Sequence, residues 1–372
     1  MSSPSTLLRR GIEGLADVAQ RPVLPGRPRP IVAVGAGAVV RDAHWPAYRR
    51  AGFSVACVHD VAIERARALA REFEVPVVAP TLAEAVARAP AGAVFDVAVP
   101  AGAIGAVLEQ LPDGAAVLVQ KPLGEDLRQA RALVELCRRK RLLAAVNLQL
   151  RFAPCLMFAR GLLERGALGA LHDVEVRVTC DMPWQRWTFL TGIPRVEIVY
   201  HSIHYVDLVR SLLGEPSGVY CKSIKHPKQA QLASTRTAIV FDYGVSRRAI
   251  ITTNHGHQFG PRHQESYVKL EGTEGSVRAL LGVNLDYPRG RPDEVEYCVL
   301  GGGGEAAPEW LRAPLVGDWF PDAFIGTMAS LMRHLDGETD ELPTSVEDAL
   351  RTMAVVEACY ESSARGATPV SG

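Results

Sequence analysis

Two histidines and one lysine carry side chains suited to acid–base chemistry. His201 and His204 lie three residues apart in the apolar stretch YHSIHYVDLVRSLLGEP, residues 200–216. An imidazole changes its charge near neutral pH and can therefore exchange a proton there. Lys121 follows the apolar run AAVLV in the sequence QKPLGED. A lysine at the end of a strand is either a solvated surface charge or a group that stabilises negative charge on a reacting oxygen.

Helix geometry separates the two histidines. At about 100° per residue, His204 belongs to a narrow polar stripe on an otherwise apolar helix. The stripe consists of Tyr200, His204, Asp207 and Ser211. His201 projects instead from the arc that carries Tyr205, Leu208 and Leu212. We therefore predict that His204 is catalytic, and that His201 is a hydrogen-bonded core residue or a contact at the edge of the substrate.

The run IVAVGAGAVVRDAHWPAYRR, residues 31–50, places Gly35 and Gly37 after a buried strand and before a helix. In a dinucleotide-binding turn the first glycine permits the bend, and the second lets the backbone approach a pyrophosphate at the helix N-terminus. Val39 and Val40 are expected cofactor contacts, and Val40 stands where a third glycine would pack helix against strand. The alternative is a tight turn without a ligand.

The next strand, FSVACVHD, ends in Asp60, 23 residues beyond Gly37. A carboxylate about 20 residues after the glycines bonds the ribose 2′-hydroxyl of NAD and repels the 2′-phosphate of NADP. Val61 and Ala62 offer no arginine for that phosphate, so we predict NAD, with NADP disfavoured. Asp60 could also be the N-cap of the following helix, and both roles can coexist.

The elements that position these residues alternate along the chain. Apolar runs IVAVGAG, FSVACVHD, AVFDVAVP and AAVLVQKP are separated by helical stretches such as IERARALAREF and DLRQARALVELCRRKR. Thr81 and Glu84 form a capping box for a helix between the second and third runs. The pattern predicts a parallel sheet over residues 30–150. Ligands bind at the carboxyl ends of such strands, where Lys121 falls.

After residue 170, strand follows strand, as in DVEVRVTC, TAIVFDYG, RAIITTNHG, SYVKLEGTEGSVRALL and EVEYCVL. This predicts an α+β domain over residues 151–372 with a mostly antiparallel sheet. The Pro-rich residues 1–29 are expected to form an N-terminal arm, and the four glycines at 301–304 a flexible turn. The fold class is thus α/β, with two domains.

Several other residues are candidates for binding. Trp184, Arg186 and Trp187 follow a strand and precede the histidine helix, and indoles stack on sugar rings. Arg151 and Trp319 are further candidates for substrate contact. His255, His257 and His263 lack a cysteine or carboxylate at ligand spacing, so no metal site is expected. We expect the His255/His257 pair to face a pocket or a subunit contact.

The composition excludes some classes of partner. The 372 residues contain 41 Lys and Arg and 41 Asp and Glu, so no broad basic field exists to hold nucleic acid or an anionic membrane. The seven cysteines form no C-x-x-C pair, which favours a reducing cytoplasm. No secretion signal or membrane-spanning run is recognisable. Expected partners are a small molecule and further copies of this chain.

The order of these motifs resembles the Gfo/Idh/MocA family, named for glucose-fructose oxidoreductase and inositol dehydrogenase. The likeness spans residues 30–365 and includes the strand end VAVP, QKPLG, NLQLRFAP, EGTEGSVR and DWFPDAFIGTM. It implies a Rossmann domain and an open-faced antiparallel sheet that usually makes the oligomer contact, here a homodimer or homotetramer. It also implies cofactor contacts by Pro100 and Gln120, and contact of Lys121 with both the cofactor and the reacting hydroxyl.

The sequence departs from the family pattern at two positions. Gln120 replaces the acid before the signature lysine, and Tyr200 replaces the aspartate four residues before His204. A carboxylate at position 200 would raise the pKa of His204, so its absence predicts a lower pKa than in relatives that have one. We expect Tyr200, His201 and His204 to contact the substrate.

Three functions remain open. The first is an NAD-dependent dehydrogenase acting on a secondary alcohol or hemiacetal of a sugar, cyclitol or polyol, with the hydroxyl between His204 and Lys121. The second is redox-neutral glycoside or ether cleavage through transient sugar oxidation, with Tyr200 and His201 as additional acid–base groups. The third is a regulator that binds a nucleotide without catalysis.

Overall fold

The computed structural model describes residues 17–287, 289–300 and 307–370. The chain divides into two compact units, neither continuous in sequence. The parallel-sheet unit comprises residues 22–152 and 320–357. The antiparallel-sheet unit comprises residues 153–319 together with the described parts of 1–21 and 358–372. The glycine run at 301–304, expected to be a flexible turn, lies outside the described residues.

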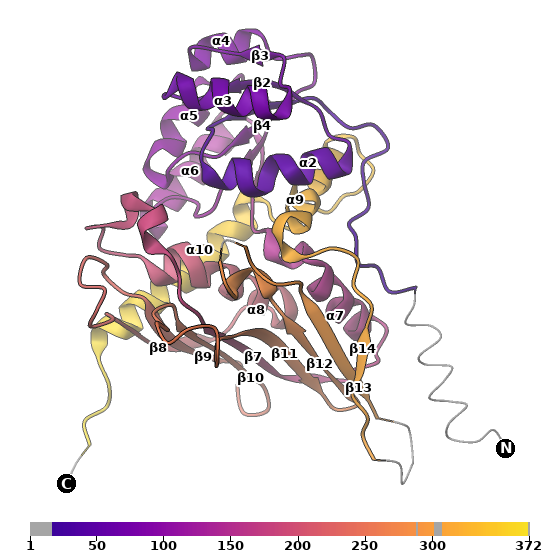
Figure 1. The fold of residues 1–372 in the computed structure, drawn as a ribbon, viewed down its shortest axis with the longest axis vertical. Helices are drawn as coiled ribbons and strands as arrows, with labels where there is room; N and C mark the ends of the chain where they lie inside the picture. Colours follow the sequence, from indigo (N-terminus) through magenta and orange to yellow (C-terminus); the bar gives the residue numbers. More distant parts are fainter. Residues whose placement is uncertain (1–16, 288, 301–306, 371–372) are drawn as a thin grey trace, which may run out of the picture. The chain divides into compact units, whose positions relative to one another are not determined.

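The parallel-sheet unit contains six parallel strands in the order β3-β2-β1-β4-β5-β6. They are β1 Ile31–Val34, β2 Val55–His59, β3 Val77–Val78, β4 Val94–Val97, β5 Ala116–Val119 and β6 Leu143–Val146 (Figure 1). The four apolar runs read from the sequence are β1, β2, β4 and β5. The central strands β1, β4 and β5 are buried along their whole length, which explains why they are apolar runs and not alternating patterns.

Helices connect these strands. They are η2 Val40–His44, α2 Trp45–Ala51, α3 Ile63–Phe73, α4 Leu82–Ala87, η3 Ala101–Ala103, α5 Ile104–Gln110, α6 Leu127–Arg139 and η4 Gln149–Phe152. The capping box is confirmed at its N-cap, because Thr81 Oγ1 accepts the Glu84 N–H at 3.2 Å. The last helices of the chain are α9 Trp319–Leu335 and α10 Val346–Arg365. Phe324, Met328 and Met332 of α9 belong to the core around β1.

The antiparallel-sheet unit contains eight strands in the order β14-β13-β12-β11-β7-β10-β9-β8. They are β7 Leu171–Thr179, β8 Gly218–Ile224, β9 Arg236–Asp242, β10 Arg248–Asn254, β11 Glu265–Gly272, β12 Gly275–Leu280, β13 Glu294–Val299 and β14 Leu311–Ala313. Among the described strands of this sheet, β7 and β10 form the parallel pair and the other pairs are antiparallel. The predicted mostly antiparallel sheet is confirmed.

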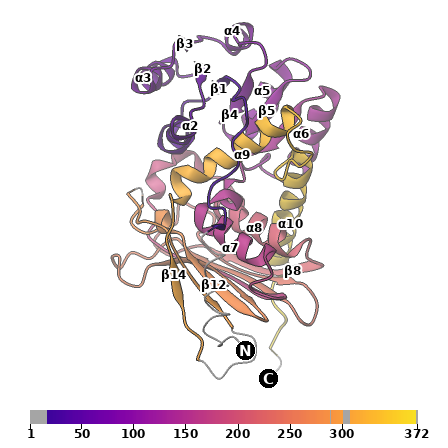
Figure 2. The ribbon, with the colours of Figure 1, turned by 90° about the vertical axis from the view of Figure 1, so that its right-hand side faces the viewer.

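Helices α7 Pro154–Glu164 and α8 Ile203–Leu213 contact this sheet and lie on the same face of it (Figure 2). The strands alternate accordingly: Val174, Val176 and Val178 of β7 are buried, whereas Arg177 is exposed on the opposite face. The short helices of the unit are η5 Trp184–Arg186, η6 Thr188–Leu190, η7 Ile198–Ser202 and η8 Gly282–Asn284. No helix of the described residues is long and apolar enough to cross a membrane.

Candidate active site

The turn after β1 has the geometry that a dinucleotide requires. Gly35 has φ +110°, and a Cβ there would lie 2.2 Å from the Ala98 carbonyl oxygen, so only glycine fits. At Gly37 an added Cβ would meet nothing within 4 Å. Glycine is therefore not needed at position 37 for packing, and the open backbone there fits the close approach of a pyrophosphate.

Asp60 lies directly after β2 and holds this turn in place. Its Oδ2 accepts the Ala36 N–H and its Oδ1 accepts the Ala62 N–H, each at 2.7 Å. The N-cap of α3 is Ala62, not Asp60, so the carboxylate makes an Asx-type contact two residues on. A carboxylate fixed beside the glycine turn fits a ribose hydroxyl.

The helix after the glycine turn begins irregularly. Residues Val40–His44 form one turn of π-helix before α2, with Val39 at its N-cap. Val40 is fully buried, so its side chain occupies space between helix and sheet. At another carboxyl strand end, Pro100 precedes η3 and is exposed. Each of these expected cofactor contacts thus lies at the carboxyl edge of the parallel sheet.

The π-helix directs His44 into a buried polar network. His44 Nδ1 lies 2.9 Å from Asp96 Oδ2, and the Tyr48 hydroxyl donates to the same oxygen at 2.9 Å. On the other side of the ring, the side-chain nitrogens of Gln120 and Asn147 lie 3.1 and 3.2 Å from His44 Nε2. Burial, together with the Asp96 charge, raises the pKa of Tyr48 well above its usual value.

The orientation of Gln120 fixes the proton on His44. Gln120 Oε1 accepts the backbone N–H of Lys121 at 2.7 Å, so its amide nitrogen must donate to His44 Nε2. The His44 proton is then on Nδ1, which donates to Asp96, and the ring is neutral. Gln120 thus links the backbone of Lys121 to His44. Neither His44 nor Asp96 was a candidate from the sequence.

Lys121 follows β5 at the carboxyl edge of the sheet, as predicted. Burial lowers the pKa of its amine to about 8, because desolvation disfavours the ammonium form. A lysine with this pKa exchanges a proton far more readily near neutral pH than a solvated lysine. The lowered pKa favours a role for Lys121 in proton exchange over that of a solvated surface charge.

In the antiparallel-sheet unit, His204 lies in the first turn of α8. Its side chain is 8% exposed, and its ring meets the Trp319 indole edge-on with centroids 5.8 Å apart. The backbone N–H of Trp319 donates to Asp293 Oδ2 at 2.6 Å. The other members of the polar stripe on α8 contact arginines of the same unit. Asp207 Oδ1 lies 3.9 Å from Arg210 Nη1, and Ser211 Oγ accepts from Arg160 at 2.7 Å.

The segment that carries His201 departs from the regular helix geometry on which its predicted placement on an apolar arc depends. Residues Ile198–Ser202 form a π-helix, which changes the angle per residue before α8 begins. The His201 ring lies 4.9 Å from that of Trp184 and 4.7 Å from that of His255. Tyr200, one residue earlier, meets Phe189 edge-on at 5.7 Å. His201 therefore belongs to a cluster of aromatic and histidine rings.

Next to His201 lies a buried cluster that the sequence did not predict, formed by Cys180, Glu197, Ser202 and His255. His255 Nε2 is 3.1 Å from Glu197 Oε1, its Nδ1 is 3.4 Å from Cys180 Sγ, and Ser202 donates to Glu197 at 2.7 Å. Burial alone would lower the pKa of His255, but interactions with Cys180 and Glu197 outweigh it and raise the pKa to about 10. Burial opposes ionisation of Glu197 as well, yet hydrogen bonding to His255 lowers its pKa overall.

The other expected binding residues are distributed between the units. Trp184 and Trp187 meet edge-on at 6.4 Å, and Trp187 packs against Tyr287 at 5.4 Å. Arg151, in the parallel-sheet unit, is committed to an ion pair with Asp348 at 2.5 Å and a hydrogen bond to a backbone carbonyl. These contacts join η4 to the first turn of α10 and to Pro343, which precedes that helix.

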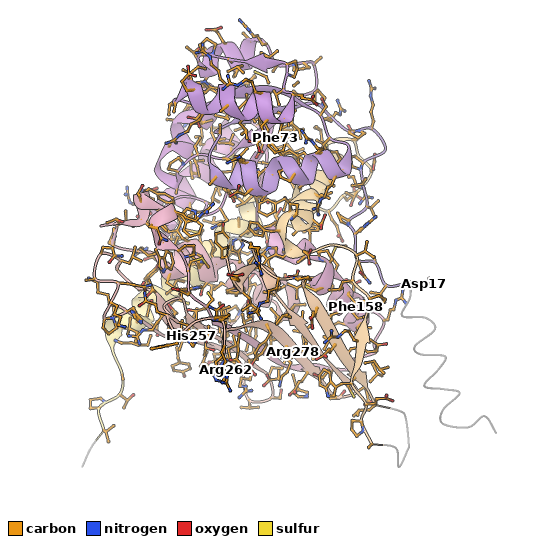
Figure 3. All side chains as sticks on the ribbon, viewed as in Figure 1. Asp17, Phe73, Phe158, His257, Arg262 and Arg278 are labelled. Atoms are coloured by element: carbon orange, nitrogen blue, oxygen red, sulfur yellow. The ribbon has the colours of Figure 1, made fainter. Side chains whose placement is uncertain are left out.

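His257 lies in the loop beyond β10, where its Nε2–H donates to the Arg262 carbonyl oxygen at 3.0 Å (Figure 3). His255, by contrast, is fully buried. The two histidines of the predicted pair thus have different environments. No group of three His, Cys, Asp or Glu side chains in the described part of the chain could hold a metal ion.

Comparison with known proteins identifies both domains. The model of an oxidoreductase family, NAD-binding Rossmann fold, matches residues 30–148, and that of its C-terminal alpha/beta domain matches residues 160–371. D-apiose dehydrogenase from Rhizobium rhizogenes is 23% identical over 267 residues, which are 66% of this chain and 69% of that protein.

Solved structures share the fold. An oxidoreductase from Agrobacterium radiobacter in complex with NAD+, L-tartaric acid and magnesium matches with a TM-score of 0.75 at 20% identity, over 92% of this chain and 98% of that one. A putative myo-inositol dehydrogenase from Sinorhizobium meliloti matches with a TM-score of 0.69 at 21% identity, over 91% and 98%. The resemblance read from the motifs is confirmed: the chain belongs to the Gfo/Idh/MocA family of NAD-binding oxidoreductases.

Proposed function

We propose that this oxidoreductase transfers a hydride between NAD and a secondary alcohol or hemiacetal carbon of a sugar, cyclitol or related polyol. The observation that carries the proposal is the half-buried Lys121 at the carboxyl end of β5, where desolvation lowers the pKa of its amine to about 8. The glycine turn and Asp60 lie at the carboxyl ends of β1 and β2 in the same sheet. The similar proteins include a D-apiose dehydrogenase and a putative myo-inositol dehydrogenase, which supports a polyhydroxylated substrate.

The residues of this chain have separate roles in the proposed reaction. Bound NAD supplies the hydride acceptor. Gly35, Gly37 and Asp60 hold its pyrophosphate and ribose. His204 takes up the proton of the substrate hydroxyl, since an imidazole has the proton affinity that this step requires near neutral pH. Lys121 orients the same oxygen and stabilises the negative charge that develops on it.

The test is NADH formation by the full chain with a panel of aldoses, inositols and glycosides. Lys121→Met and His204→Asn should each lower kcat by about 100-fold or more, the usual contribution of a general acid or base. Lys225→Met, which changes an exposed lysine, is the matched control and should retain activity. Full activity in Lys121→Met would contradict the role proposed for Lys121.

Redox-neutral cleavage of a glycoside or ether is a second candidate. It is favoured by the rings beside His201, since His255 lies 4.7 Å away and offers a further titratable group. Stoichiometric NADH release supports the dehydrogenase. Turnover of a glycoside without net NADH, on copurified cofactor, supports cleavage. If no panel member reduces NAD and no glycoside is cleaved, both proposals fail.

We further propose that the enzyme is a cytoplasmic homodimer or homotetramer. All seven cysteines are free thiols, which suits a reducing compartment. The face of the eight-stranded sheet opposite α7 and α8 exposes Tyr220 (70%) and Val240 (37%), which are paired neighbours on β8 and β9. This face is the surface proposed to join the subunits.

A further inference from the structure

A large cavity lies within the antiparallel-sheet unit. Its volume is about 890 Å³, and its lining residues fall within 181–191, 228–232, 258–264, 286–287 and 289–291. Binding cavities for small molecules typically measure about 300–1,000 Å³. This cavity is near the upper end of that range, so a single small sugar ring would leave much of it empty.

Glutamine dominates the polar lining of this cavity. Gln185, Gln229, Gln231, Gln258 and Gln264 line it, and they are five of the ten glutamines in the chain. Gln185, Gln231 and Gln258 are exposed, and each of these side-chain amides offers a carbonyl acceptor and two N–H donors. Gln229 Oε1 already accepts from Thr235, and Gln264 Nε2 already donates to the Gly260 carbonyl. A sugar hydroxyl is itself both donor and acceptor, so it matches an amide in either orientation. The lining therefore suits a ligand with many hydroxyl groups.

Two buried polar atoms of lining residues have no partner among the described residues. They are the carbonyl Oε1 of Gln264 and the indole Nε1 of Trp184. Buried polar atoms are rarely left without a hydrogen bond. Both atoms are shielded from solvent within the wall of the cavity, so a ligand is recognised by the exposed amides of the lining and not by these two atoms.

The charges of the lining do not favour a highly charged ligand. Lys228, Arg289 and Arg291 are opposed by Asp181 and Asp286, and Arg289 pairs with Asp286 at 3.4 Å. The lining therefore has one excess positive charge, and solvent screens its attraction for an anion. A nucleotide diphosphate, by contrast, is usually held by several converging cations or a helix N-terminus.

One wall of the cavity also belongs to the histidine cluster. Trp184 lines the cavity and meets the His201 ring at 4.9 Å, and His201 is three residues before His204 in sequence. Indole faces also stack on the apolar faces of sugar rings. A ligand in the cavity is therefore next to η7, the helical turn that carries His201 and leads into α8.

We propose that this cavity binds a second, uncharged sugar unit, so that the preferred substrate is a disaccharide or larger glycoside and not a free monosaccharide. This inference rests on the proposed sugar oxidoreductase activity, since it assigns the part of the substrate remote from the reacting carbon. The glutamines hydrogen-bond the hydroxyls of the second unit, and Trp184 packs against its ring.

The test compares cellobiose, maltose and lactose with glucose and galactose in the NADH assay. For at least one disaccharide, kcat/KM should exceed that of its monosaccharides by at least tenfold. Gln185→Ala/Gln258→Ala changes two exposed side chains of the cavity and should lower this disaccharide-to-monosaccharide ratio about tenfold. Gln110→Ala, an exposed glutamine of the other unit, is the control and should leave the ratio unchanged.

Binding is measured separately from catalysis with Lys121→Met, by saturation-transfer NMR with the same sugars. Contacts to both rings of a disaccharide support the inference, and loss of the contacts to one ring in the double glutamine variant supports its location. Equal kcat/KM for monosaccharides and disaccharides overturns the inference but leaves the proposed oxidoreductase intact. A preference for UDP-glucose over every disaccharide also overturns it. If no sugar of either kind is oxidised, the proposed function fails, while the NMR experiment still decides whether the cavity binds sugar.

Discussion

Gln120 forms a bridge between the backbone of Lys121 and the ring of His44. It carries no charge, so the buried network contributes the Asp96 carboxylate as its negative group. A glutamate at this position could accept from Lys121 but could not donate to His44. The added carboxylate would favour the ammonium form of Lys121.

We therefore predict that Gln120→Glu raises the pKa of Lys121 above about 8. Activity that needs the ammonium form falls as pH rises through that pKa, so the alkaline limb of kcat/KM should move to higher pH by about one unit, as a neighbouring charge typically causes. The measurement is the pH profile of kcat/KM. Gln110→Glu adds the same charge on the surface and should not move the limb; an unmoved limb in Gln120→Glu itself would contradict the prediction.

Tyr200 leaves His204 without a carboxylate four residues before it. Tyr200→Asp should raise the pKa of His204, because a negative charge favours the imidazolium form. The acidic limb of the rate profile, where His204 loses its proton and becomes a base, should then move to higher pH. Tyr200→Asn removes the ring without adding charge and serves as the control. The idea fails if both variants have the wild-type profile.

His255 makes stability depend on pH. Its pKa is raised to about 10 in the folded chain, against about 6.5 when unfolded. The resulting stabilisation is fully present below pH 6.5 and is lost as pH rises through about 10. His255→Gln should destabilise the protein by about 3 kcal/mol near pH 6, since it leaves the buried Glu197 unpaired.

The measurement for His255 is the difference in melting temperature between wild type and His255→Gln from pH 6 to pH 10. The difference should shrink steadily with rising pH. Exposed His263, changed to Gln, should show no such trend. A constant difference across the range would mean that His255 is not charged in the folded protein.

At the scale of elements, the two glycines of the turn between β1 and η2 should affect different properties. Gly35 should affect the stability of the unit, and Gly37 the affinity for NAD. Gly35→Ala places a Cβ against the Ala98 carbonyl at a positive φ, which should destabilise the unit by at least 1–2 kcal/mol. Gly37→Ala meets no protein atom within 4 Å, so its melting temperature should stay near that of wild type. It should nonetheless weaken NAD binding about tenfold or more, measured by calorimetry. Unchanged affinity in Gly37→Ala would remove the turn from the cofactor site.

Most regular elements were predictable because their patterns are local. The helix IERARALAREF is α3 to the residue, and the runs chosen as strands lie in β1, β2, β4 and β5. The two-residue strand β3 offers too few positions for a pattern. Strand β6, Leu143–Val146, directly follows the charged end of α6, so its short apolar run resembled a continuation of the helix.

The site was less predictable, for two physical reasons. The first is irregular helix geometry: a sequence pattern assumes one angle per residue, and the π-helices at Val40–His44 and Ile198–Ser202 depart from it. They turn His44 inward and His201 towards Trp184. The second is distance along the chain, since Cys180, Glu197 and His255 meet only through sheet pairing and packing.

At the scale of the whole molecule, the proposed subunit contact follows from sheet register. One row of paired residues crosses the outer face of the eight-stranded sheet: Tyr220, Val240, Ile250, Glu175, Lys269 and Arg278. It passes from an apolar end to a charged end. Such a face can bury the apolar part against a symmetry mate and keep the charges at the rim.

Light scattering should therefore report a dimer or tetramer at micromolar concentration. Val240→Glu places a charge in the apolar part of the row and should dissociate the oligomer. Val245→Glu alters a valine that is wholly exposed in the turn between β9 and β10 and should not. A wild-type monomer at these concentrations would rule out the proposed contact.

The core of the parallel-sheet unit is completed by α9, whose Phe324, Met328 and Met332 pack with β1 and α2 residues such as Ile31 and Tyr48. These residues leave the ribosome about 180 positions after the end of β6. During synthesis the six strands must therefore wait, with an apolar surface uncovered, until the entire antiparallel sheet has been made. A chain stopped near residue 152 has every cofactor-binding residue but not the helix that closes their core, so premature termination should yield a target for chaperones and not a small NAD-binding protein.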